Sequence, residues 1–207
     1  MVSKNRMEKI ISQLISEKIL KTPEIIEAFL FIDRKDFVPI EHQVSAYEDC
    51  ALPIGYGQTI SQPYTVAFML ELLGPKEKDK ILDVGSGSGW TTALLSKIVG
   101  EKGKVFGLER IPELVDFGKK NLSKYGFNNY KIMQAKETLG LSEEAPFDKI
   151  LVSAAAEELP QDLIDQLRIG GIMVIPIKDA ILKIVKSSEN KIDTQRFVGF
   201  AFVPLIE

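Results

Sequence analysis

From residue 65 onward, the sequence alternates short apolar runs with segments of helical period. The apolar runs are KILDVG, KVFGLE, NYKIMQA, FDKILVSAA and IMVIPI, and the helical segments are VAFMLELLG, TTALLSKIVG, PELVDFGKKNLSKYG and PQDLIDQLRIGG. Strands that alternate with helices at this spacing are typical of βαβ units with a buried parallel sheet. After the last run, ILKIVKS and QRFVGFAFVPLI flank SENK and predict a β-hairpin. We therefore expect an α/β fold whose mostly parallel sheet ends in an antiparallel hairpin.

The first 64 residues have a different character. Residues 5–20 predict an amphipathic helix, and a second helix is expected to begin with Thr22 as N-cap and Pro23 in its first turn. The apolar positions expected to face inward are Ile10, Ile11, Leu14, Ile15 and Ile19 in the first helix and Ile25, Ile26, Phe29 and Leu30 in the second. Residues 40–63 read as a long connection, and connections of that length are more often functional than filler. We expect residues 1–64 to pack as helices and a functional loop on a core formed by residues 65–207.

Composition excludes several classes of protein. The 26 basic and 29 acidic side chains give a net charge of −3, which argues against a nucleic-acid-binding surface. Cys50 and His42 are the only cysteine and the only histidine, so an intrachain disulfide and a Cys-rich or multi-His metal site are excluded, and we expect no metal. The charged N-terminus and the lack of any apolar run of about 20 residues predict neither a signal peptide nor a membrane span. We expect a cytoplasmic protein that binds neither nucleic acid nor membranes.

The most informative motif is DVGSGSGW, residues 83–90, which follows a predicted strand and opens a predicted helix. Its glycines allow a sharp turn and a close approach of a ligand to the backbone. A dinucleotide fingerprint would need Gly or Ala where Trp90 stands, and a phosphate-binding P-loop would need a Lys-Ser or Lys-Thr pair after the glycines. Both of these nucleotide motifs are therefore disfavoured.

Two acids narrow the ligand further. Asp83 immediately precedes the glycines and suits a ligand with a positive group, while Glu109 ends the next strand, where it can accept hydrogen bonds from both ribose hydroxyls. This combination favours S-adenosylmethionine, a cationic nucleoside. A glycine turn that serves only packing, or a nicotinamide or flavin cofactor, remains an alternative.

At this point the sequence resembles the protein-L-isoaspartate O-methyltransferase family. The segment GQTISQP, residues 57–63, ahead of a methyltransferase glycine loop is the specific part of the resemblance. The other matching segments are AYED at 46–49, LPIG at 52–55, APFD at 145–148, AAA at 154–156, QL at 166–167, GG at 170–171 and VPL at 203–205.

The resemblance implies a class I, Rossmann-like methyltransferase with a seven-stranded sheet and an N-terminal helical extension. It implies methyl transfer from S-adenosylmethionine to the α-carboxylate of L-isoaspartyl residues in damaged peptides and proteins. The carboxylate is already ionised at neutral pH, so alignment can supply most of the acceleration, up to about 7–11 kcal/mol in favourable cases. A chain with one histidine, one cysteine and no expected metal is suited to that task.

The resemblance also implies roles for individual residues. Ser61 would be the active-site hydroxyl that holds the acceptor carboxylate, with Thr59 and Ile60 lining the junction of cofactor and substrate; the alternative for Ser61 is to cap the following helix. The implied cofactor contacts are Gly85, Ser86, Gly87 and Gly89 as a cradle, Asp83 near the methionine end, Glu109 on the ribose and Arg110 beside the adenine. Val203 and Leu205 belong to the segment that would pair with the substrate peptide backbone.

The sequence departs from the family pattern at Lys136, which stands where an Asp usually accepts a hydrogen bond from the adenine amino group. A lysine ammonium has no acceptor, so this contact is lost, at a cost of about 1.5–3 kcal/mol. Our hypothesis is that Glu137 takes over the adenine amine. Two other functions remain open: methylation of a different protein or peptide carboxylate, and a non-catalytic peptide-binding module of the same fold. Trp90 is expected either to cover the cofactor loop or to pack beneath it.

Overall fold

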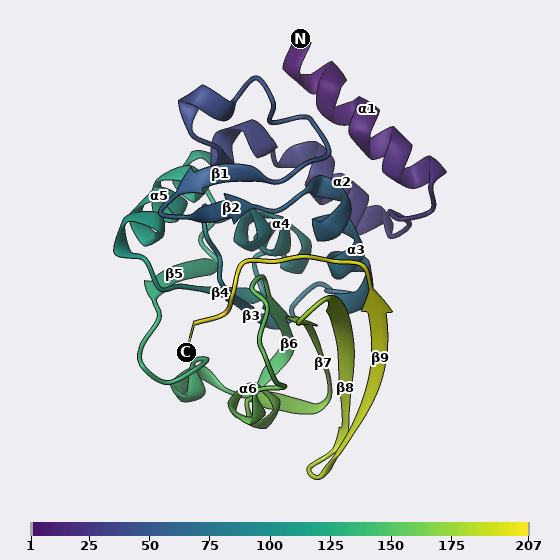
Figure 1. Ribbon diagram of the computed structural model, residues 1–207, viewed down its shortest axis with the longest axis vertical. Helices are drawn as coiled ribbons and strands as arrows, with labels where there is room; N and C mark the ends of the chain where they lie inside the picture. Colours follow the sequence, from purple (N-terminus) through teal and green to yellow (C-terminus); the bar gives the residue numbers. More distant parts are fainter. Residues whose placement is uncertain (1, 207) are drawn as a thin grey trace.

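The computed structural model describes residues 2–206, with the side chains of residues 7–206, and is built on a seven-stranded sheet (Figure 1). The strand order is β5-β4-β3-β6-β7-β8-β9; β3 to β7 are parallel, and β8 and β9 are antiparallel to their neighbours. The mostly parallel sheet with an antiparallel end is thus confirmed. The strands are β3 (Lys80–Val84), β4 (Lys104–Glu109), β5 (Tyr130–Gln134), β6 (Phe147–Val152), β7 (Leu167–Ile177), β8 (Ala180–Ser188) and β9 (Lys191–Val198).

The core lies on both faces of the sheet because successive strand residues point to opposite sides. Ile81 and Val105 belong to the cluster under the helices α3 (Pro63–Leu73), α4 (Trp90–Val99) and α5 (Pro112–Leu122). Leu82 and Phe106 belong to the opposite cluster, which is covered by the short helix α6 (Gln161–Asp165) and the segment before β6. Both faces are therefore buried, as a parallel sheet requires.

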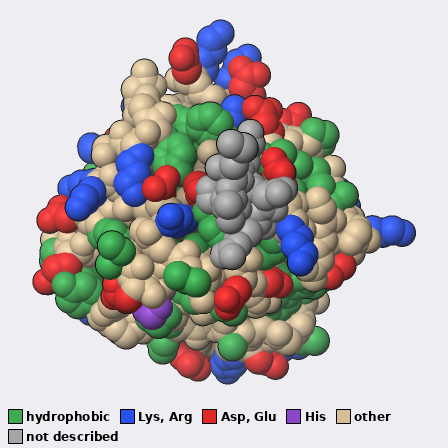
Figure 2. Space-filling model, turned by 90° about the horizontal axis from the view of Figure 1, so that it is seen from above, with side chains coloured by type: hydrophobic (Ala, Val, Ile, Leu, Met, Phe, Trp, Pro, Cys, Tyr) green, Lys and Arg blue, Asp and Glu red, His purple; other side chains and the backbone are tan. Residues whose placement is uncertain are grey.

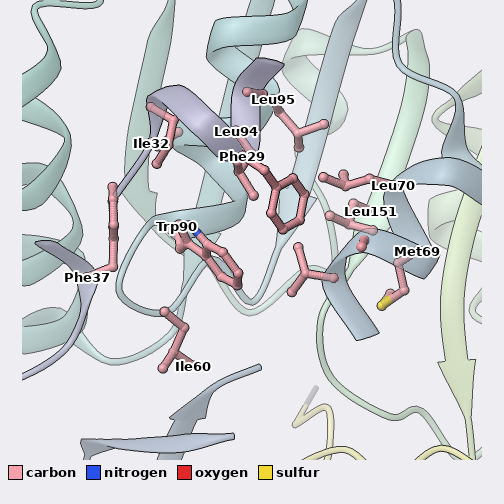
Figure 3. Packing of buried hydrophobic residues seen from close by; sticks show 14 of the residues in the cluster. Phe29, Ile32, Phe37, Ile60, Met69, Leu70, Trp90, Leu94, Leu95 and Leu151 are labelled. Atoms are coloured by element: carbon pink, nitrogen blue, oxygen red, sulfur yellow. The ribbon is translucent and has the colours of Figure 1, made fainter. Parts of the chain in front are cut away.

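The N-terminal helices α1 (Val2–Ser16) and α2 (Pro23–Phe31) form an outer layer, with α2 packed on α4. Leu14 and Phe29 are buried in one cluster with Trp90, and Figure 3 shows Phe29 beside Trp90. Two expected inward positions are wrong: Ile15 is 42% and Leu30 48% exposed, because each lies about 100° around its helix from a buried neighbour. The expected division of the chain into residues 1–64 and 65–207 remains a prediction. Residues 1 and 207, the outer bounds of the two parts, lie outside the described residues.

The N-terminus of α2 is also built differently from the expected cap. Thr22 occupies the N-cap position, but its side chain makes no capping hydrogen bond. Its hydroxyl instead donates to Glu71 of α3 over 2.8 Å. The Thr22 hydroxyl therefore links α2 to α3 and does not cap α2.

The sequence predicts one long irregular connection over residues 40–63, and this prediction is wrong. These residues contain a short 3₁₀ turn (Ile40–His42) and an antiparallel hairpin of β1 (Leu52–Gly55) and β2 (Gln58–Ile60). The turn residues Tyr56 and Gly57 have φ of 54° and 71°, which suits the right-handed twist of a tight hairpin. The sequence does not predict these strands because they are short and β1 contains Pro53 and Gly55, which are unusual in strands. In Figure 1 the hairpin appears next to α4, and Ile54 of β1 lies close to the loop after β3, because a Cβ on Gly87 would be 3.2 Å from its Cδ1.

Two expectations near the C-terminus are corrected. The helix expected after Pro160 ends at Asp165, and residues 167–171 already belong to β7, where Leu167 pairs with Phe147. The last strand ends at Val198, and residues 199–206 run back across the molecule as an extended segment (Figure 1). Ala155 holds this segment, because its N–H donates to the Val203 carbonyl over 2.8 Å and its carbonyl accepts the Leu205 N–H over 2.7 Å.

The outer surface carries charges of both signs. Figure 2 shows acidic and basic side chains interspersed on the face seen from above. Within residues 2–206, none of the helices combines the length and the apolar character that crossing a membrane requires.

Candidate active site

A pocket of about 350 Å³ lies at the carboxyl ends of the central strands. The strand order reverses there: β3 has β4 on one side and β6 on the other. Open α/β sheets bind ligands at such a point because the loops after the two strands diverge and leave a crevice. The walls include five parts of the chain: the loop after β3, residues 108–111, residues 134–140, residues 58–61 at the end of the hairpin, and residues 203–206.

The glycine loop forms the floor of this pocket and packs tightly on α5. Gly85, Gly87 and Gly89 have φ of 76°, 53° and 88°, which L side chains rarely adopt. A Cβ on Gly89 would lie 2.5 Å from Leu122 Cδ1 and 3.2 Å from the Cα of Gly118. Only glycine therefore fits at position 89, because of its backbone conformation and because α5 approaches it closely. Gly118, which makes that approach possible, was not singled out from the sequence.

Asp83 lies beneath the loop and is fully buried. Its Oδ2 accepts hydrogen bonds from the hydroxyls of Thr91, over 2.7 Å, and Thr92, over 2.6 Å, both in the first turn of α4. Its Oδ1 has no hydrogen-bond partner among the described residues, and neither has the buried hydroxyl of Ser86. A buried acceptor without a donor is costly. Asp83 does not itself line the pocket, so its effect on a ligand above the loop would come from its negative charge.

Burial raises the pKa of Asp83 to about 6; the two threonine hydroxyls oppose that rise, and the negative charge of Glu109 adds to it. The charged form of this carboxylate is therefore poorly compensated by the protein alone. A cation in the pocket would restore the balance, because an opposite charge at close range favours the ionised form.

Glu109 is held at the end of β4 with only 7% of its surface exposed. Its Oε2 accepts the Gly87 N–H and its Oε1 accepts the Ile111 N–H, each over 2.9 Å. A carboxylate has about four acceptor positions, so each oxygen can still receive a ligand hydroxyl. Glu109 thus fixes the glycine loop and keeps the capacity for a ribose.

The hairpin brings Thr59, Ile60 and Ser61 to the opposite wall. Ser61 is half-buried, and its carbonyl accepts a hydrogen bond from Arg34 over 3.0 Å. The N-cap of α3 is Gln62, and no side-chain hydrogen bond caps the helix, so capping does not explain Ser61. The structure therefore brings Ser61 and the glycine loop to one pocket.

Lys136, Glu137 and Arg110 lie at the end of the pocket that is expected to receive the adenine. Lys136 is exposed and forms an ion pair with Glu143. Glu137 and Arg110 are exposed side chains in the wall of the pocket. Glu137 is thus available at this end of the pocket, next to the position where the family has its Asp.

Trp90 packs beneath the loop, which decides between its two expected placements. Its ring is 2% exposed, lies edge-on to Phe29 with centroids 5.6 Å apart, and has the Arg34 guanidinium 5.3 Å from its centroid. Figure 3 shows it with Phe29 and Ile60 in the same cluster. Arg34 was missed because nothing in its sequence surroundings indicates that it is buried. Thr91 and Thr92 could have been found, because a buried acid requires nearby donors.

Among the described residues, no group of three or more His, Cys, Asp or Glu side chains could hold a metal ion. Val203 and Leu205 line the far rim of the pocket and are half-buried. The site residues expected from the sequence line this one pocket, with the exception of Asp83 and Gly89, which are not part of its lining.

Residues 5–207 match the sequence profile of the family described as protein-L-isoaspartate(D-aspartate) O-methyltransferase (PCMT). A protein-L-isoaspartate O-methyltransferase from Ignicoccus hospitalis is 42% identical, and the alignment covers 98% of each chain. The corresponding protein from Fervidobacterium nodosum is 47% identical over 88% of this chain and 93% of its own.

Solved structures give the same relationship in three dimensions. The crystal structure of a protein described as a protein-L-isoaspartate O-methyltransferase from Plasmodium falciparum, in complex with S-adenosyl-L-homocysteine, superposes with a TM-score of 0.83 and 29% identity. The match covers 99% of this chain and 98% of that one. The class I, Rossmann-like methyltransferase architecture expected from the sequence is confirmed by this agreement.

Proposed function

The chain belongs to the protein-L-isoaspartate(D-aspartate) O-methyltransferase family, and from this premise we propose how its pocket methylates L-isoaspartyl residues of damaged proteins. S-adenosylmethionine supplies the methyl group as an electrophilic sulfonium. The observation that carries the proposal is that residues 59–61, the glycine loop and residues 203–206 all line one pocket. Acceptor and donor sites are thus adjacent, as a direct transfer requires.

We propose that the cofactor lies along the carboxyl ends of β3 and β4. The cofactor would lie against the backbone of the glycine loop, formed by Gly85, Ser86, Gly87 and Gly89. The Oδ1 of Asp83, which has no hydrogen-bond partner, would lie beneath the methionine end. Glu109 would accept from the ribose hydroxyls. Arg110 and Glu137 would flank the adenine. The negative charge of Asp83 beneath the loop and the remaining lone pairs of Glu109 support this orientation, because the cofactor carries a positive sulfonium and ribose hydroxyls.

We propose that Ser61 donates a hydrogen bond to the acceptor carboxylate and holds one of its oxygens toward the methyl group. Thr59 and Ile60 would shield the junction from water. The carboxylate is the nucleophile in its ordinary ionised state, so no side chain has to remove a proton. The methyl ester can expel methanol, whereas the carboxylate would have to expel hydroxide. The adjacent backbone amide nitrogen can therefore attack the ester carbonyl and close to a succinimide, which water reopens in part to aspartate.

Val203 and Leu205 are proposed to line the path of the peptide. Ala155 already holds this segment extended through the Val203 carbonyl and the Leu205 N–H. An extended segment fixed in advance can receive another extended chain with little added loss of conformational entropy. The proposed partners are accordingly isoaspartyl-containing peptides and proteins of varied sequence.

The test of the function uses S-adenosylmethionine with a labelled methyl group, a short isoaspartyl peptide and its aspartyl twin. We expect base-labile label on the isoaspartyl peptide alone. Label on neither peptide, with cofactor binding intact by calorimetry, would assign the pocket to another carboxylate acceptor. Equal label on both peptides would contradict the proposed specificity.

Replacing Ser61 by alanine is expected to lower kcat for the isoaspartyl peptide about 10- to 100-fold, because one hydrogen bond to a charged group is worth about 1.5–3 kcal/mol. Cofactor affinity should stay unchanged, since the hydroxyl is proposed to contact only the acceptor. Steady-state kinetics and calorimetry separate the two effects. A Ser45→Ala variant, changed at a half-buried serine outside the pocket whose hydroxyl donates to Glu48, is the matched control. Full activity in Ser61→Ala would remove Ser61 from the mechanism.

Replacing Glu137 by alanine is expected to weaken cofactor binding about tenfold or more, because the adenine amine would lose its acceptor. Adding Lys136→Asp to that variant should recover the lost affinity, since it restores a carboxylate at the position where the family has one. Calorimetric titration with S-adenosylhomocysteine measures both steps. Unchanged affinity in Glu137→Ala would refute the hypothesis that Glu137 serves the adenine.

A further inference from the structure

Arg34 is completely buried, and its hydrogen-bond partners are backbone carbonyls of the segment that ends in Ser61. Nη1 donates to Ala46 over 2.9 Å and to Glu48 over 3.3 Å. Nη2 donates to Cys50 over 2.8 Å and to Ser61 over 3.0 Å. One guanidinium thus gathers carbonyls from the beginning and the end of this segment, which includes the β1–β2 hairpin.

The same guanidinium is anchored on the cofactor side. Its carbon lies 5.3 Å from the ring centroid of Trp90, the first residue of α4, directly after Gly89 of the cofactor loop. Trp90 is itself buried and packed edge-on against Phe29 of α2 (Figure 3). Arg34 therefore lies between the wall that carries Ser61 and the helix whose N-terminus forms the floor of the pocket.

We propose that Arg34 is a positioning residue, which sets the distance and direction of Ser61 and the hairpin relative to the cofactor's methyl group. This inference rests on the proposed role of the pocket in methyl transfer. A misplacement of about 1 Å can cost about 100-fold in rate when catalysis depends on alignment. The reaction proposed here uses alignment and no proton removal, so it is sensitive to such a change.

The chemistry of the side chain fits this task. A guanidinium is planar and spreads its donors over a fixed fork, so it can hold separated carbonyls and stack on an indole at the same time. Burial lowers the pKa of Arg34 to about 10, which leaves it protonated at neutral pH. A lysine would offer three donors from a single point and could not span the same carbonyls.

The experiment compares Arg34→Met, Arg34→Lys and the control Lys186→Met in the full-length protein, at a temperature where circular dichroism shows each to be folded. Lys186 is also a buried cation that donates to a backbone carbonyl, that of Ile164, over 3.1 Å, but it does not line the pocket. Its variant therefore reports what the loss of a buried cation does to stability alone.

We expect kcat for the isoaspartyl peptide to fall about 100-fold in Arg34→Met and about tenfold in Arg34→Lys. The Kd for S-adenosylhomocysteine should change less than about fivefold in both, because the cofactor contacts remain in place. Lys186→Met should keep kcat within about twofold of the parent. The emission of Trp90, the only tryptophan of the chain, should change in the Arg34 variants and not in the control.

Any of the following results would overturn the proposal: kcat within twofold of the parent in both folded Arg34 variants, equal losses of kcat and cofactor affinity, or a loss in Lys186→Met that matches Arg34→Met. Failure of both Arg34 variants to fold would assign the residue to the fold alone and overturn it as well. The parent must first methylate the isoaspartyl peptide, so a failure of the proposed function would be seen separately, before any variant is compared.

Discussion

Replacing Glu109 by glutamine is expected to weaken binding of S-adenosylhomocysteine about 100- to 1,000-fold. The carboxylate accepts the N–H groups of Gly87 and Ile111, one on each oxygen. An amide has a single acceptor oxygen, so its NH₂ group would face one of these N–H groups and leave two donors without an acceptor. The lost charge-assisted bonds, including the proposed ribose contact, together cost about 3–4 kcal/mol.

Calorimetric titration of the purified variant measures this loss. Glu113→Gln is the matched control, because Glu113 is an exposed acid in the first turn of α5 and lies outside the pocket. It should bind the cofactor product as tightly as the parent. If Glu109→Gln also bound within about tenfold of the parent, Glu109 would be an anchor of the glycine loop without a role in holding the ribose.

The strands, the helices that cover them and the glycine loop were predictable because their signals are local. Apolar runs of strand length, separated by helical periods, dictate a parallel sheet whatever the distant contacts are. The loop at 85–89 was predictable for a similar reason, because glycines between a strand and a helix indicate positive φ and close approach. Asp83 and Glu109 followed from their positions at strand ends.

The errors arose where distant contacts outweigh local preference. The helical pattern predicts a helix through residues 167–171, yet these residues extend β7 because Leu167 pairs with Phe147 on the neighbouring strand. The hairpin of β1 and β2 was missed because its strands are short and contain Pro53 and Gly55. Arg34 was missed for another reason: its partners are backbone carbonyls, which leave no trace in side-chain identity.

Replacing Asp83 by asparagine is expected to stabilise the ligand-free protein while weakening its cofactor binding. The folded pKa of about 6 lies above the ordinary value of 3.8, so the folded state binds this proton more tightly than the unfolded state does. Above pH 6 the ionised carboxylate then destabilises the fold by about 3 kcal/mol, at about 1.4 kcal/mol per pKa unit. Asparagine removes the charge and should raise the free energy of unfolding at pH 7 by about 2–3 kcal/mol.

The difference in free energy of unfolding between the parent and Asp83→Asn, measured as a function of pH, reports the titration of Asp83 alone. In the parent, the contribution of Asp83 to stability should fall as pH rises from about 4 to about 6, because the unfolded state loses its proton first. The gain of Asp83→Asn over the parent should therefore be near zero at pH 4 and complete above pH 6.5. Urea unfolding at each pH measures it, with Asp116→Asn, changed at an exposed acid of α5, as the control.

The ligand-free fold is more stable with an uncharged side chain at position 83, whereas cofactor binding should be stronger with the charged one. A cationic ligand favours the ionised carboxylate, so the affinity of the parent for S-adenosylmethionine should fall as pH is lowered through 6, while that of Asp83→Asn should be weak and nearly independent of pH over the same range. At pH 7.5 we expect the variant to bind about 10- to 100-fold more weakly. A variant that gained stability and kept full affinity would show that the charge of Asp83 does not serve the cofactor. A variant that lost both would show that the protein itself requires the carboxylate, because Thr91 and Thr92 would then depend on its charge for their hydrogen bonds.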